Sequence, residues 1–148
     1  MAEHYKKILL ALDFLENDDI VTERALQVVQ QFSCKLSIIH VVESVPVVDM
    51  GYGAEIPYNM DLMTELMTSA KHKLEQIAQQ LGITEAECWL EVGSPKQEII
   101  RVAEENKIDL IVVGSHGRHG LALLLGSTAN SVLHHAPCDV LAVKLPTE

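Results

Sequence analysis

The sequence predicts an α/β fold: a single domain spanning residues 1–148, built on a five-stranded, mostly parallel sheet with helices on both faces. Short apolar segments alternate with longer amphipathic segments along the chain. Several short segments are apolar on successive residues, which is typical of strands covered on both faces. Hydrophobic residues make up 48% of the 148 residues, which is enough for the core of one ordinary domain.

Five short apolar segments predict the strands of the sheet. They are KILLAL at 7–12, KLSIIHVV at 35–42, ECWLEV at 87–92, DLIVVG at 109–114 and CDVLAVKL at 138–145. Trp89 alternates with its strand neighbours, so we expect it to pack in the sheet and not to stack on a base. His40 follows an apolar run, and we expect it to be a hydrogen-bonded core residue.

Four segments between the strands predict helices, at 17–32, 59–82, 94–106 and 127–136. The third has a clear start, because Ser94 can cap it, Pro95 suits its first position and Gln97 can complete a capping box. The second carries an apolar stripe at helical spacing, which predicts a core-facing side with methionines as core filling. That stripe contains Met63, Leu66, Met67, Ala70, Leu74, Ile77 and Leu81.

The alternation of strands and helices also predicts where a ligand binds. Parallel sheets of this kind bind ligands beyond the carboxyl ends of their strands, where the strand order reverses. We expect the first and fourth strands to border that crevice. The segment 43–59 has two prolines and two glycines and no steady period, which predicts a long surface loop. It is either a plain connection or a lid over the crevice.

The stretch VVGSHGRHGLALLLGSTAN at 112–130 joins the fourth predicted strand to the last helix. Gly114 and Gly117 permit positive φ or close approach of a ligand to the backbone. Ser127 is a plausible cap, and the first-turn amides from Thr128 onward have no helical partners. Free amides and the positive end of the helix dipole attract anions. The stretch is therefore either a phosphate site or an ordinary long turn.

Asp13 lies at the carboxyl end of the first predicted strand. Its carboxylate can accept hydrogen bonds from ribose hydroxyls or an adenine amine, or hold a metal ion, and it can equally be a turn or capping aspartate. His116 and Arg118, inside the glycine turn, either contact a phosphate or face solvent. The second acid that a phosphoaccepting receiver domain has beside such an aspartate is absent, which argues against that fold. No residue is predicted to be catalytic.

Composition and missing signatures exclude several function classes. The formal net charge is −10 with no basic run, which argues against nucleic-acid binding. No apolar run approaches the roughly 18 residues of a membrane span, and MAEHYKK leads into a strand, so we expect a cytoplasmic protein. The three cysteines are far apart and predict reduced thiols without a metal. There is no Gly-x-Ser-x-Gly elbow and no Gly-Lys-Ser/Thr loop.

Longer stretches resemble the universal stress protein family over nearly the whole chain. YKKILLALDF is similar to the family's first strand, LSIIHVVE to its second, VGSPKQEIIRVAEENKIDLIVVGSHGRHG to its third helix and fourth strand, and HHAPCDVLAV to its ending. Gly114-x-x-Gly117 followed by Gly126-Ser127 resembles the family's nucleotide signature. Eight residues separate Gly117 from Gly126, one fewer than is usual in the family.

The resemblance implies a fold like that of the adenine nucleotide alpha hydrolases, with strand order 3-2-1-4-5, and a site for ATP, AMP or ADP, with or without Mg²⁺. It also implies a homodimer through the last strand. Leu15 stands where many members have Ser, so a polar contact is lost there. By position, the implied roles are adenine and ribose contacts from Ala11, Leu12 and Asp13, a backbone contact to the adenine edge from Val41, a border of the base or ribose at Val113, and phosphate contacts from Gly114, Gly117, Gly126, Ser127 and Thr128.

Three functional hypotheses follow. The preferred one is an adenine-nucleotide-binding module that acts in stress response as a sensor or a nucleotide-gated interaction protein. The second is a dimeric stress-response interaction protein without nucleotide, which the shortened spacer favours. The third is a slow ATPase, whose metal-dependent turnover would disappear in Asp13→Ala.

Overall fold

The computed structural model describes residues 5–14, 17–43, 56–84, 87–115 and 127–146, leaving aside the side chains of residues 56–61 and 127. It contains a five-stranded sheet in the order β3-β2-β1-β4-β5, with every pairing parallel. Both the predicted strand order and the predicted parallel direction are confirmed. The strands are β1 (Lys7–Ala11), β2 (Lys35–Glu43), β3 (Cys88–Gly93), β4 (Leu110–Gly114) and β5 (Asp139–Val143).

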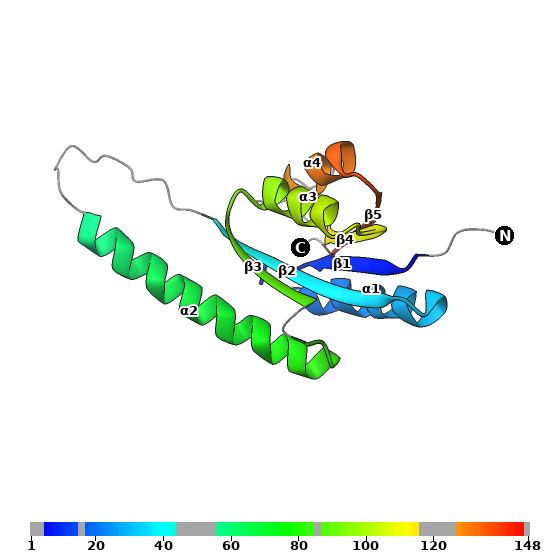
Figure 1. Cartoon of the computed structure of the whole chain (residues 1–148), viewed down its shortest axis with the longest axis horizontal. Helices are drawn as coiled ribbons and strands as arrows, with labels where there is room; N and C mark the ends of the chain where they lie inside the picture. The colour runs from blue at the N-terminus through cyan, green and yellow to red at the C-terminus, as the bar shows by residue number, and fades with distance from the viewer. Residues whose placement is uncertain (1–4, 15–16, 44–55, 85–86, 116–126, 147–148) are drawn as a thin grey trace.

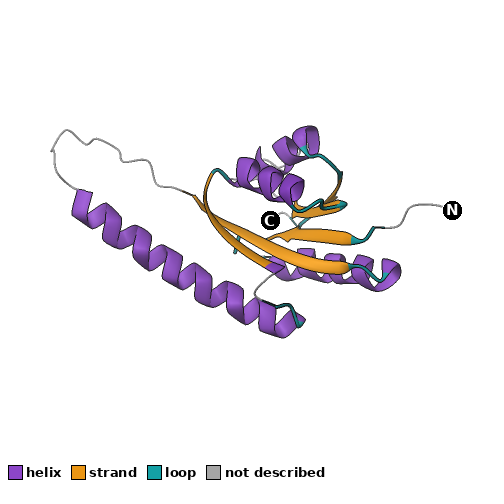
Figure 2. Ribbon diagram, viewed as in Figure 1, coloured by secondary structure: helices purple, strands orange, loops and turns teal. Residues whose placement is uncertain are grey.

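Helices cover both faces of this sheet, so the domain has three layers (Figure 1, Figure 2). One pair packs on one face and the second pair on the opposite face, as the contacts between elements agree. The first pair is α1 (Asp18–Phe32) and α2 (Ile56–Leu81), and the second is α3 (Pro95–Glu105) and α4 (Ser127–His135). The predicted α/β fold is therefore confirmed.

The core consists of two apolar layers, one on each side of the sheet. Successive residues of β1 point to opposite faces, so Ile8 and Leu10 pack toward α1 and α2 while Leu9 packs toward α3 and α4. β4 repeats the pattern with Val112 on the first side and Ile111 on the second. Burying one such side chain stabilises the fold by about 1.5–3 kcal/mol. Because both faces of these strands are buried, their sequences are apolar at successive residues.

Asp109 ties the start of β1 to the start of β4. One carboxylate oxygen, Oδ2, accepts hydrogen bonds from the backbone N–H groups of Lys6 and Lys7, each at 2.9 Å. The backbone N–H of Asp109 in turn donates to the carbonyl of Lys7 at 2.9 Å. These bonds fix the register of the two strands that border the predicted crevice.

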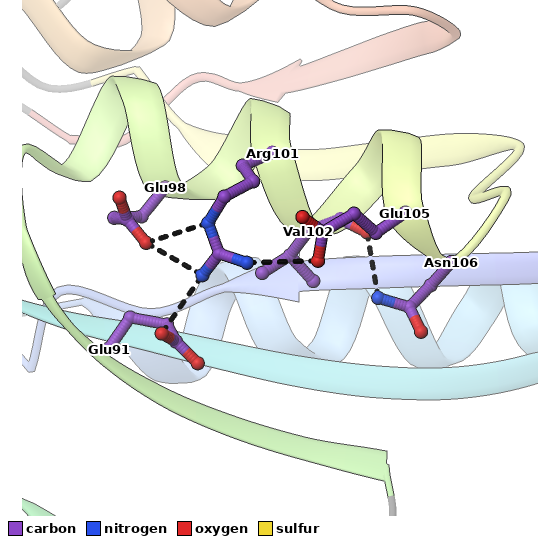
Figure 3. Close-up of polar contacts among 6 residues, drawn as sticks. All are labelled: Glu91, Glu98, Arg101, Val102, Glu105 and Asn106. Atoms are coloured by element: carbon purple, nitrogen blue, oxygen red, sulfur yellow. Dashed lines mark hydrogen bonds and ion pairs between the residues drawn. The ribbon is translucent and has the colours of Figure 1, made fainter.

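Arg101 links α3 to the edge strand β3. Its guanidinium contacts Glu91 of β3 at 2.9 Å, and Glu98 and Glu105 of its own helix at 2.7 and 2.9 Å (Figure 3). The two helical partners lie three residues before and four residues after the arginine, on the same face of the helix. One cation thus gathers three carboxylates from two elements.

Two predicted features of the helices are wrong in part. Residues 56–58, predicted only as loop, belong to α2, whose first turn accommodates Pro57 because the first-turn N–H groups need no helical partner. Residues 44–55 of the predicted loop, where a lid was considered, lie outside the described residues. Ser94 is the residue before α3 and Pro95 is its first, as predicted, but the Ser94 side chain makes no capping hydrogen bond.

The apolar stripe of α2 reaches the core only in its second half. Ala70 and Leu74 are buried, whereas Leu66 is 38% exposed and Met63 is half-buried. Figure 1 shows the reason: the amino-terminal part of α2 extends beyond the sheet. The prediction of a continuous core-facing stripe is therefore wrong for this part of the helix.

Candidate functional site

The strand order reverses between β1 and β4. The chain leaves β1 for β2 on one side, and it returns from β3 to pair β4 on the other side of β1. The two strands are in register from Ile8 with Leu110 to Leu10 with Val112, and they end at Ala11 and Gly114. Connections that leave neighbouring strands toward opposite faces open a crevice at this edge. The predicted pairing of the first and fourth strands at the reversal is confirmed, and ligand binding between their ends stays a prediction.

The predicted residues after β1 differ in burial. Ala11 is half-buried and packs on the side of α3 and α4, Leu12 is buried, and Asp13 is exposed. The backbone N–H of Leu12 donates to the carbonyl of Ile39 at 2.9 Å, which continues the pairing with β2 by one residue. The exposed Asp13 side chain therefore follows directly on a fixed backbone.

Val41 lies near the carboxyl end of β2 with its side chain buried. The carbonyl of Ile39 faces β1, because it accepts the hydrogen bond from Leu12. Backbone polar groups of alternate residues in a strand point the same way, so the carbonyl of Val41 points toward the side where β1 has ended. This orientation suits the backbone contact predicted for Val41.

The last predicted group comes from β4 and α4. Val113 is buried, and Gly114 is half-buried in register with Val143. Ser127 is the first residue of α4 and Thr128, in the same first turn, is half-buried. Because α4 returns between two parallel strands, its amino end lies at the same edge of the sheet as the carboxyl end of β4. Gly117 and Gly126, together with His116 and Arg118, lie outside the described residues.

Asp18, the first residue of α1, lies near the predicted site and was not among the predicted residues. The turn between β1 and α1 bends through positive φ angles at Phe14 (62°) and Asn17 (73°). The Phe14 backbone N–H donates to Oδ2 of Asp18 at 2.8 Å. Burial, followed by the charge of Asp13 and the hydrogen bond to it, raises the pKa of Asp18 to about 7.

His40 supports the same turn from β2. Its Nδ1 lies 2.7 Å from the carbonyl oxygen of Leu12, and Nδ1 donates because a carbonyl only accepts. The imidazole stacks on the ring of Phe14, and Nζ of Lys73, from α2, lies 4.9 Å from the centroid of that ring. Burial lowers the pKa of His40. The expectation of a hydrogen-bonded His40 is confirmed, as is that of Trp89 packing in the sheet, against the α3 and α4 side.

A separate groove of about 530 Å³ lies at the opposite end of β2. Its walls are mainly apolar, with one lysine and one glutamate at the rim, so it offers no cluster of phosphate donors. It is lined by Leu26, Val29, Lys35, Leu36, Leu81, Gly82, Ile83, Thr84 and Glu87. This groove is distinct from the predicted crevice.

In the part of the chain that the structure describes, no three His, Cys, Asp or Glu side chains gather to hold a metal ion. Within the same ranges, no helix combines the length and hydropathy of a membrane span. Cys34, Cys88 and Cys138 are half-buried, and no disulfide joins them in the described part of the chain.

The chain matches known proteins along almost its entire length. The model of the universal stress protein family matches residues 4–144. Universal stress protein A homolog 2 of Coxiella burnetii is 42% identical over 144 residues, which cover 97% of each chain. The solved structure of UspA from Lactobacillus plantarum is 26% identical with a TM-score of 0.79, covering 96% of this chain and 99% of that one. A universal stress protein solved in complex with cAMP is 24% identical with a TM-score of 0.61, covering 95% and 98%, and shares the fold.

A family match over residues 4–144, together with the parallel sheet in the order β3-β2-β1-β4-β5, agrees with the resemblance seen in the glycine motif and the strands. The chain belongs to the universal stress protein family.

Proposed function

We propose that this chain binds an adenine nucleotide, which is ATP, AMP or ADP, in the crevice between the carboxyl ends of β1 and β4. The observation that carries the proposal is the convergence of four features at this edge: the exposed Asp13, the carbonyl of Val41, the end of β4 at Gly114 and the amino end of α4. The family and the fold agree with this proposal, and one protein of the same fold has been solved with cAMP, itself an adenine nucleotide.

Each part of the nucleotide has a matching group in this proposal. Ala11, Leu12 and Val113 border the base and ribose, Asp13 accepts hydrogen bonds from hydroxyl or amine groups, and Val41 offers its backbone to the adenine edge. The phosphates belong to Gly114, Gly117, Gly126, Ser127 and Thr128, where main-chain N–H groups and the α4 dipole attract negative charge. Bound Mg²⁺ would neutralise part of the phosphate charge.

We further propose that the protein is a cytoplasmic homodimer that pairs through β5. This strand ends the sheet at one edge. The carbonyl of Val143 accepts a hydrogen bond from the backbone N–H of Ser115, so the polar groups of Val143 face β4. By alternation, those of Val140 and Ala142 point outward and are available to a second copy. In the stress response, such a dimer would act as a sensor or a nucleotide-gated interaction protein.

The experiment that tests nucleotide binding is mass analysis of gently purified and then denatured protein, followed by titration with ATP. Release of an adenine nucleotide, or saturable binding, supports the proposal. We expect Gly117→Val to abolish binding with little loss of fold, because a side chain there blocks backbone approach to the phosphates. Absence of both release and binding favours the second function, a dimeric interaction protein without nucleotide, to which the shortened spacer between Gly117 and Gly126 also points.

A further inference from the structure

We propose that His40 is a positioning residue for base recognition, because it binds the Leu12 carbonyl and thereby leaves the backbone N–H and carbonyl of Val41 for a purine. The inference rests on the proposed nucleotide function for its ligand. The release of the Val41 backbone groups stands on hydrogen bonds among described residues of β2 and of the segment that follows β1.

The pairing of β1 with β2 defines the hydrogen bonds that Val41 would make if the pairing continued. The two strands pair in parallel up to Ala11 with Ile39, and the Leu12 N–H donates to the Ile39 carbonyl at 2.9 Å. Backbone groups of alternate residues point to the same side, so the N–H and the carbonyl of Val41 both point toward β1. One more step of this pattern would join the Val41 N–H to the Leu12 carbonyl, and the Val41 carbonyl to the Phe14 N–H.

Both of these partners are bonded to side chains instead. Nδ1 of His40 lies 2.7 Å from the Leu12 carbonyl oxygen and donates to it. The Phe14 N–H donates to Oδ2 of Asp18 at 2.8 Å. Among the described residues, the Val41 N–H has no backbone acceptor on the side of β1. A backbone donor and acceptor in this position call for water or a ligand, because unpaired backbone groups are costly where water is excluded.

The His40 ring is held in this orientation by packing as well as by its hydrogen bond. It stacks on the phenyl ring of Phe14, and Nζ of Lys73 lies 4.9 Å from the centroid of that phenyl ring. Because the Leu12 carbonyl only accepts, a neutral His40 ring carries its proton on Nδ1. This tautomer is a signature of the proposed role that can be measured without any ligand.

The available backbone groups of Val41 match the edge of adenine. A donor and an acceptor that point the same way suit a base that presents an acceptor beside a donor, as adenine does with N1 and its N6 amino group. The 6-oxo base of IMP presents the reverse, a carbonyl oxygen beside a protonated N1. If Asp13 and the amino end of α4 hold the ribose and the phosphate, the base has no freedom to turn over, and AMP is preferred to IMP.

The test compares the wild type with two variants of His40. His40→Phe keeps a ring against Phe14 but has no donor, whereas the amide nitrogen of His40→Asn can take the place of Nδ1. Nitrogen NMR reports the tautomer of His40. Hydrogen exchange compares the Val41 amide with the Ile39 amide, which faces β1 within the paired part of β2. Titrations measure the affinities for AMP and IMP.

We expect the ligand-free wild type to carry the His40 proton on Nδ1 and to exchange the Val41 amide about tenfold or more faster than the Ile39 amide. It should bind AMP about tenfold more tightly than IMP. In His40→Phe the Leu12 carbonyl is released to accept from Val41, so exchange of the Val41 amide should slow and the preference for AMP should disappear. His40→Asn should resemble the wild type in both respects.

Three results would overturn the inference: a His40 proton on Nε2, a Val41 amide that exchanges as slowly as that of Ile39 in the wild type, or an unchanged preference for AMP in a folded His40→Phe. The first two are measured on the wild type and do not depend on how the variant folds. If the tautomer and the exchange are as expected but the wild type binds neither AMP nor IMP, the release of the Val41 backbone groups is supported and the proposed nucleotide function fails.

Discussion

The imidazole of His40 lies almost flat against the phenyl ring of Phe14, with 3.7 Å between ring centroids and 17° between planes. This contact joins β2 to the turn that follows β1, and the hydrogen bond from His40 to the Leu12 carbonyl reinforces it. Two elements that carry proposed nucleotide contacts are thereby held together by one side chain. Partial burial of His40 in this contact lowers its pKa and so opposes its protonation.

The first prediction concerns His40 and acid. Its folded pKa lies below the unfolded value, so the unfolded chain binds more protons as pH falls below about 6.5, and stability is lost through that window. We expect thermal melts from pH 7 to pH 5 to show a larger loss for the wild type than for His40→Asn, whose amide retains a donor toward Leu12. The Asp18 contribution has the opposite sign, with stability falling as pH rises from about 4 to about 7, and is common to both proteins. Equal pH dependence in the two proteins would exclude this role for His40.

The second prediction concerns Arg101. Arg101→Met leaves Glu91, Glu98 and Glu105 close together without their shared cation, so the melting temperature should fall. The loss should shrink in high salt, because ions screen the repulsion between these partly exposed carboxylates. Arg101→Lys is the matched control, since it retains the charge but not the fork of donors, and should lose less. A salt-independent loss would show that packing of the side chain matters more than its charge.

The third prediction compares a buried and an exposed apolar side chain. Ile111 of β4 is 0% exposed, and Ile111→Ala should lower the free energy of unfolding by about 2–5 kcal/mol through lost burial and a cavity. Leu133 of α4 is 47% exposed, and Leu133→Ala should change stability by no more than about 0.5 kcal/mol. Urea denaturation measures both. Similar losses of stability at the two positions would contradict the placement of Ile111 in the core and of Leu133 at the surface.

The fourth prediction concerns the proposed dimer. Proline at Ala142 removes an outward backbone N–H and leaves the hydrogen bonds to β4 in place. We expect Ala142→Pro to be a folded monomer by circular dichroism and sedimentation. Leu141→Pro instead removes a donor on the side of β4 and should destabilise the fold. A folded Ala142→Pro that still sediments as a dimer would rule out pairing through β5.

Most of the fold could be predicted because strands and helices that are buried on one or both faces have characteristic spacings of apolar residues. The apolar runs around Leu9 and Ile111 marked central strands, and the amphipathic segments between them marked helices. The start of α2 was missed by three residues although Pro57 gave a signal for a first helical turn. The exposure of Leu66 could not be predicted, because the spacing of apolar residues in a helix does not indicate how far the helix extends beyond the sheet.

The candidate site was only partly predictable. Asp13 was found from its position after a strand, whereas Asp18 was missed because its contact depends on left-handed conformations at Phe14 and Asn17. Phe14 gave no signal for this conformation, whereas Asn17 is of a residue type that is enriched in it. The contact of Glu91 with Arg101 could not be predicted either, because only the packing of α3 on β3 brings the two side chains together.

The bonds from Asp109 to Lys6 and Lys7 have a consequence for biosynthesis. Their partners are 103 and 102 residues apart, so β1 completes its pairing only after most of the chain has left the ribosome. Until then the nascent chain holds β1 with one unpaired edge, a state prone to misassembly. Closing so long a segment slows folding, and we expect the emerging chain to depend on chaperones until β4 is made.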